Sequence, residues 1–100
     1  MTKLVFVFNE KDLKKFDVTK EELLKEVRVF ANENGIIESS FGVFEKDSED
    51  AMALCIKIAS RILKGNQVYV ACLKKLELDV DGEIEDCIVS HREWMKMRNV

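Results

Sequence analysis

Six carboxylates lie within ten residues near the end of the chain, with no basic residue among them: Glu77, Asp79, Asp81, Glu83, Glu85 and Asp86. A hard cation such as Ca²⁺ binds where several oxygens converge at about 2.3–2.6 Å. Alternate side chains of a strand point to opposite faces, however, and the spacing of an EF-hand loop is incomplete here. We therefore favour a solvated hairpin over a metal site. In this interpretation Asp79, Asp81 and Glu83 present an acidic surface to a basic partner.

The three cysteines and the single histidine are the next residues with chemical potential. Cys55, Cys72 and Cys87 are at least fifteen residues apart, whereas structural zinc sites take their ligands in close pairs. His91 follows Cys87 by four residues, which on a strand would separate the two side chains by roughly 13 Å. We therefore expect reduced, buried thiols and no zinc. A small enzyme that uses Cys87 and His91 remains the second alternative function.

Lys57, Arg61 and Lys64 recur at helical spacing and could together receive a phosphate backbone. No aromatic residues lie among them for base stacking, and the formal net charge of the chain is −3. A solvated helix face is the simpler interpretation. A nucleic-acid-binding module is the first alternative function.

The C-terminal segment contains the only tryptophan and two of the four methionines beside basic residues. Trp, Met and Arg are enriched among the anchors of protein interfaces. We therefore predict Trp94, Met95, Met97 and Arg98 as interface residues. The alternative is that Trp94 folds back into the core.

Length and composition predict one globular domain over residues 1–100, since 47% of the residues are hydrophobic and 35% are charged. The chain has no glycine-rich phosphate loop and no nucleophile-elbow motif, so we expect no cofactor and no enzymatic activity. Its apolar runs are much shorter than the ~20 residues of a membrane span, and no signal-peptide pattern begins it. We expect a cytoplasmic protein that does not bind membranes.

Apolar patterning predicts the first half of the fold. Residues 3–9 form a central strand with apolar side chains on both faces, which we expect to be covered on both sides. Residues 10–18 form a connection, with or without a helical turn in it. Thr19 and Glu22 then form a capping box that begins a helix, and Asn34-Gly35 ends it.

The second half follows from the same signals. Residues 36–46 form a strand, in which Gly42 marks either a bulge or a close contact. Asp47 or Ser48 caps a largely buried helix that runs to about residue 64 and stops at Gly65. Residues 67–79 and 83–90 form a hairpin. Ser90 begins a short helix over residues 91–97.

These elements predict an α/β fold of the two-layer α+β kind, in the order β-α-β-α-β-β. We expect a four-stranded mixed sheet with two helices, with or without a short C-terminal helix, and right-handed β-α-β crossovers. If both helices cover one face, the other face exposes Val5 and Val7, and an exposed apolar sheet face is a typical interaction site.

We therefore predict a small non-enzymatic domain that binds another protein. Its role would be regulatory or inhibitory, as in accessory proteins that include viral ones. Three elements could cover the apolar face: the other helix, the terminal segment Trp94–Met97, or another chain. Among the intermolecular solutions a twofold homodimer is the commonest, and we expect one here.

Overall fold

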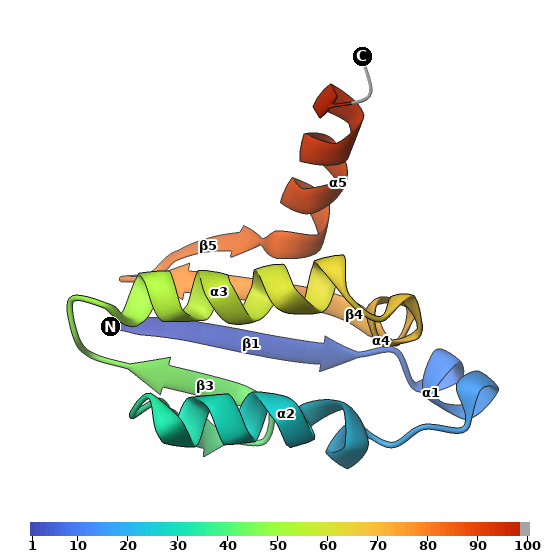
Figure 1. The fold of residues 1–100 in the computed structure, drawn as a ribbon, viewed down its shortest axis with the longest axis horizontal. Coiled ribbons are helices and arrows are strands. Elements are labelled where there is room, and N and C mark those ends of the chain that lie inside the picture. The colour runs from blue at the N-terminus through green and yellow to red at the C-terminus, as the bar shows by residue number, and fades with distance from the viewer. Residues whose placement is uncertain (99–100) are drawn as a thin grey trace.

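The computed structural model describes residues 1–98 of the chain, and the side chains of residues 1–97. Within this range it is an α+β fold built on one five-stranded sheet (Figure 1). The strands are β1 (Thr2–Phe8), β2 (Ile37–Ser40), β3 (Val43–Lys46), β4 (Leu73–Val80) and β5 (Glu83–Asp86). Their order is β2-β3-β1-β4-β5, and every neighbouring pair is antiparallel. The class is as predicted, but a mixed sheet of four strands was wrong.

The extra strand arises because residues 36–46 form a hairpin and not one continuous strand. Gly42 has a φ of 74°, a left-handed conformation that suits a tight turn. Its carbonyl oxygen accepts a hydrogen bond of 2.9 Å from the amide of Phe6. The returning strand β3 inserts between β2 and β1. The two strands joined through the first long helix therefore run in the same direction without being neighbours.

Five helices connect these strands within residues 1–98: α1 (Glu10–Phe16), α2 (Lys20–Glu33), α3 (Ala51–Lys64), α4 (Gln67–Ala71) and α5 (Cys87–Arg98). Three of them begin at a side-chain cap that the apolar pattern does not reveal. The side chain of Asn9 accepts from the amides that begin α1, Asn66 caps Val68 of α4, and Asp86 accepts 3.0 Å from the amide of Ile88 in α5. The connection predicted at 10–18 contains a complete helix, α1. The two predicted hairpin strands, 67–79 and 83–90, were too long: α4 occupies the beginning of the first, and α5 occupies the end of the second. The C-terminal helix is present, and it begins earlier than predicted.

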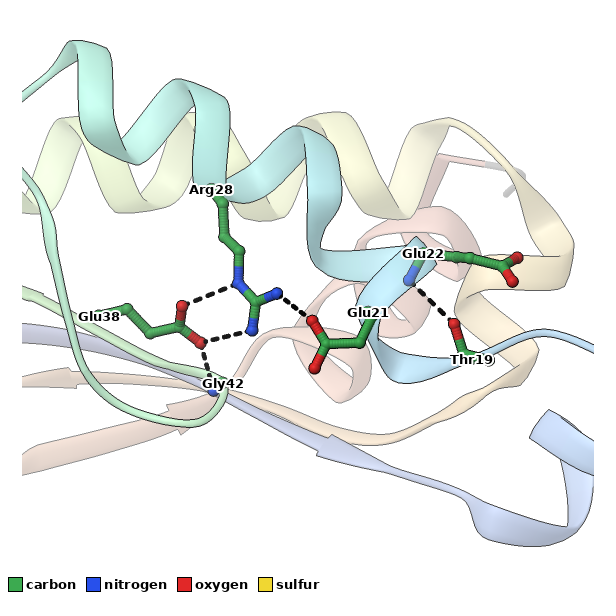
Figure 2. Close-up of polar contacts among 6 residues, drawn as sticks. All are labelled: Thr19, Glu21, Glu22, Arg28, Glu38 and Gly42. Atoms are coloured by element: carbon green, nitrogen blue, oxygen red, sulfur yellow. Dashed lines mark hydrogen bonds and ion pairs between the residues drawn. The ribbon is translucent and has the colours of Figure 1, made fainter.

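The two long helices lie close to their predicted positions. The Thr19 hydroxyl accepts 3.2 Å from the amide of Glu22, although the Glu22 carboxylate points away from Thr19 (Figure 2). Asn34 is the C-cap residue of α2, and Gly65 is that of α3. The N-cap residue of α3 is Asp50, not Asp47 or Ser48. We predicted that α3 is largely buried, but two of its apolar side chains, Met52 and Ile56, are about half exposed.

The core lies between one face of the sheet and the helices. Leu4 of β1 is opposite Phe44 of β3 and Leu78 of β4, and these side chains form a buried row across the sheet. The other face of β1 carries Val5 and Val7, which are only partly buried. Among residues 1–98 no helix covers that face, so the prediction that β1 is covered on both sides was wrong.

Cross-strand charges make the open face more polar than predicted. Lys3 lies between Glu45 of β3 and Asp79 of β4, with its ammonium nitrogen 3.9 Å from a Glu45 oxygen. The valines therefore share this face with charged groups, and the row of Lys3, Glu45 and Asp79 ends in two exposed isoleucines, Ile37 and Ile84.

A polar cluster attaches the β2–β3 hairpin to α2 (Figure 2). Arg28 donates to both oxygens of Glu38, from Nε at 2.8 Å and from Nη2 at 3.1 Å, and its third nitrogen pairs with Glu21. The amide of Gly42 donates 2.9 Å to the same Glu38 carboxylate. The Arg28 guanidinium also lies 5.3 Å from the centre of the Phe41 ring. One carboxylate thus joins the turn of the hairpin to the helix that precedes it.

We expect Glu38→Gln to destabilise the fold by about 1 kcal/mol at pH 7, because it removes a charge-assisted bidentate pair that is partly screened by solvent. Arg28 first, and then the Gly42 amide, lower the pKa of Glu38 below its ordinary value of 4.5. The stabilisation is therefore full above pH 4.5 and is lost as the pH falls through the folded-state pKa. Urea unfolding at neutral and acidic pH should show a difference between parent and variant that vanishes in acid. The control Glu49→Gln should show none at either pH.

Candidate functional site

The C-terminal helix α5 leaves the sheet directly after β5. It packs chiefly against β4, β5 and α3, and Ile88 in its first turn is its buried anchor at 5% exposure. Figure 1 shows the remainder of α5 projecting beyond the edge of the sheet. Asp86 sets this direction because its carboxylate caps the helix immediately after the strand ends.

The predicted anchors lie on the projecting part of this helix. Trp94 is 44% exposed, Met95 is 42% exposed and Met97 is 76% exposed. Trp94 is therefore not part of the hydrophobic core. Its ring stacks on His91 at 6.1 Å between ring centres, and the Lys64 ammonium lies 5.7 Å from its centre.

The outward side of α5 carries three exposed apolar side chains, Val89, Trp94 and Met97, which form an apolar arc that Glu93 interrupts midway between Val89 and Met97. Val89 and Met97 are eight residues apart on one helical ridge, and Trp94 neighbours Met97 at a spacing of three. This arc lies on the side opposite Ile88. Val89 was missed because residues 83–90 were predicted as a strand, and its i, i+8 relation to Met97 was the signal that could have found it. The side chain of Arg98 lies outside the described residues.

The acidic hairpin does not gather its carboxylates at one point. Asp81 and Gly82 form its two-residue turn with φ values of 52° and 91°, as Asp-Gly predicts. Asp79 accepts 2.8 Å from the Gly82 amide, and Asp81 lies 2.6 Å from the amino group of Met1. Glu83 is on β5 and faces the opposite side from Asp79. Nowhere in the described residues do three or more metal-ligating side chains come together.

Most charges of the hairpin and of α5 have no ion-pair partner within the described residues. The exception is Asp81 in the turn, which pairs with the amino group of Met1. The carboxylates of β4 and β5 make no ion pair with a lysine or arginine, and Arg92 and Lys96 of α5 make none with an acid. Acidic strands and a helix with two unpaired cations therefore lie next to each other at one end of the sheet.

Cys87 and His91 lie one turn apart on α5, so the strand geometry assumed for this pair was wrong. Cys87 is half-buried, and burial raises the pKa of its thiol to about 11, with further contributions from Glu85 and Asp86. A nucleophilic thiol needs the opposite shift. Cys55 and Cys72 are buried free thiols.

The three cationic side chains of α3, Lys57, Arg61 and Lys64, lie beside different neighbours. Lys57 lies 5.8 Å from the centre of the Phe30 ring on α2, and Lys64 lies over Trp94 on α5. Arg61 borders a groove between α2 and α3. These three cations do not form one continuous basic surface for a phosphate backbone. Nucleic-acid binding therefore remains an untested prediction. Within residues 1–98 no helix has the length and apolar character needed to cross a bilayer.

Alkylation should report the Cys87 environment. With a pKa of about 11 in place of the ordinary 9.0, the folded protein holds about 100-fold less thiolate at neutral pH than an ordinary cysteine. We expect the iodoacetamide rate at Cys87, followed by peptide mass mapping, to keep rising up to pH 10. The same peptide in urea should reach half of its maximal rate near pH 9 and level off about one pH unit above that. A folded-state rate that levels off at the same pH as the rate in urea would contradict this assignment.

Comparison with known proteins gives no indication of function. No protein-family model matches the chain, and neither a curated protein nor a solved structure shows significant similarity to it.

Proposed function

We propose that the chain is a small, non-enzymatic protein-binding domain whose binding element is α5. The observation that carries the proposal is the projection of this helix with its outward side chains exposed. A helix of 12 residues is only marginally stable in water unless it packs against something. Val89 and Met97 keep about half or more of their surface exposed, so a partner surface that covers them would stabilise the helix further. The raised thiol pKa of Cys87 argues against this residue as a nucleophile.

The apolar arc of α5 supplies the binding energy in this proposal. Burying the side chains of Val89, Trp94 and Met97 contributes about 1.5–3 kcal/mol for each residue buried fully. Met adapts to irregular surfaces, and Trp is among the commonest interface hot spots. Met95, on the other side of the helix, contributes less.

The partner that fits best is a second copy of this chain. Arg92 and Lys96 flank the apolar arc, while the hairpin beside α5 presents unpaired carboxylates. A twofold axis near β5 would set the basic helix of each copy against the acidic hairpin of the other. The same helix–hairpin contact would then form twice in the dimer, and each would pair cations with carboxylates. Direct pairing of two β5 edges is disfavoured, because it would place Glu83 and Glu85 against the carboxylates of the other copy.

We expect light scattering coupled to size exclusion to give roughly 23 kDa, twice the chain mass of 11.6 kDa. Met97→Asp should weaken the dimer at least tenfold, because a charge would enter an apolar contact. The control Met52→Asp places the same charge on an exposed methionine of α3 and should leave the mass unchanged. Far-UV circular dichroism should show that both variants stay folded.

Charge reversal separates the proposed contact from other modes of association. Arg92→Glu should shift the chain towards monomer, and the double variant with Glu83→Lys should recover part of the loss. A monomer of 11.6 kDa at about 1 mM would exclude the homodimer, since an affinity that weak has no functional use.

A further inference from the structure

The face of the sheet that no described helix covers carries an unpaired carboxylate, Glu77 of β4. Its cross-strand neighbours are Val5 of β1 and Asp86 of β5, and neither is a cation. Glu77 is partly buried, and it makes no ion pair among residues 1–98. Because a partly buried charge is costly without a counter-charge, a cation that covers Glu77 would stabilise this face.

Apolar side chains lie near this carboxylate on the same face. Val5 and Val7 of β1 are partly buried, and Ile84 of β5 is 63% exposed. Ile84 belongs to this face because its cross-strand partner is Asp79, which lies two residues beyond Glu77 on β4. An exposed apolar surface with a few charged groups is typical of a protein-binding site.

One side of α5 carries the complementary groups. Val89, Arg92 and Lys96 recur at i, i+3 and i+7, so their side chains lie along one side of the helix. Arg92 and Lys96 are each two residues from Trp94, which is about 200° of helical rotation, and the Trp94 ring faces Lys64 of α3. Because α3 packs on the core face of the sheet, this side of α5 points the same way as the open face.

We propose that α5 of each copy lies across the open sheet face of a second copy. This inference rests on the proposed function, which makes α5 the binding element and a second copy its partner. α5 leaves the sheet at its β5 edge (Figure 1). With a twofold axis near that edge, the helix therefore passes over β5, then β4 and then β1 of the other copy.

The spacing of the two cations matches the spacing of the strands that they cross. Lys96 lies four residues beyond Arg92, which is about 6 Å along the helix axis, and β4 lies about 4.8 Å beyond β5. When Arg92 is at the acidic β5 edge of the other copy, Lys96 is therefore above β4. There it pairs with Glu77 of the other copy, which gains the counter-charge that it has nowhere in its own described chain.

The apolar side chains come into register in the same arrangement. Val89 precedes the cations and lies beside Ile84 of the other copy, and both side chains are about half exposed or more in the single chain. Met97 is next to Lys96, and its flexible side chain reaches Val5 of the other copy. Trp94 stays at the rim of the contact, beside its own α3. The open face thus receives a helix from the second copy.

Charge reversal on the open face tests this placement. Glu77→Lys should weaken dimerisation about tenfold at low salt, because it sets a cation against the basic side of α5. Lys96→Glu should cause a similar loss, and the double variant should recover most of it. The matched control Glu33→Lys makes the same change at an exposed site of α2 and should leave dimerisation unchanged.

Sedimentation equilibrium over a concentration series gives the dissociation constant of each variant, and far-UV circular dichroism shows whether it is folded. If Glu77→Lys fails to fold, Glu77→Gln should give a smaller loss in the same direction. Isotope-filtered NMR on a mixture of labelled and unlabelled protein detects contacts between copies alone. It should show nuclear Overhauser contacts from the Met97 methyl group to the Val5 methyl groups.

Two results overturn this inference, and they are distinguishable. The first is a dimer that Met97→Asp weakens but Glu77→Lys does not, with no contact between copies at Val5. It would place α5 elsewhere on the second copy and leave the proposed function intact. The second is a chain that stays monomeric at about 1 mM, which would overturn the homodimer together with this inference.

Discussion

The register of β1 against its two neighbours is the constraint on which the remaining structure depends. β1 pairs antiparallel with β3 and β4, and this pairing aligns Leu4 with Phe44 and Leu78 in one buried row. A slip of one residue would turn the whole apolar set to the other face. Because the register gives the sheet one apolar face, α2 and α3 both pack there (Figure 1). The opposite face can then carry the Lys3–Glu45 pair without cost to the core.

One-sided packing also explains where the two candidate surfaces lie. The helices cover the centre of the sheet, so the edge strand β5 and the helix that leaves it stand beyond them. This gives α5 its exposure, and it leaves the carboxylates of β4 and β5 without a lysine or arginine partner among the described residues. The opposite face of the sheet stays open for the same reason, since both long helices pack on the other side.

Local signals predicted the elements that have strong periodicity or strong turn chemistry. The Thr19 cap, the Gly65 stop and the Asp81-Gly82 turn each act through atoms within a few residues, so the sequence alone suffices to place them. The same reasoning failed for short apolar runs. Residues 67–71 and 87–90 contain β-branched residues that favour a strand, but Asn66 and Asp86 cap helices there. Periodicity cannot separate a strand from a helix over so few residues.

The sequence by itself determined the α+β class, the two long helices, the acidic hairpin and the types of residue available for binding. Only the tertiary structure decided the strand order, the insertion of β3 beside β1 and the exposure of Trp94. Strand order depends on pairing between distant segments, which composition does not encode locally. Whether Trp94 is core or surface depends on the direction in which α5 leaves β5. The Asp86 cap and the burial of Ile88 set that direction together.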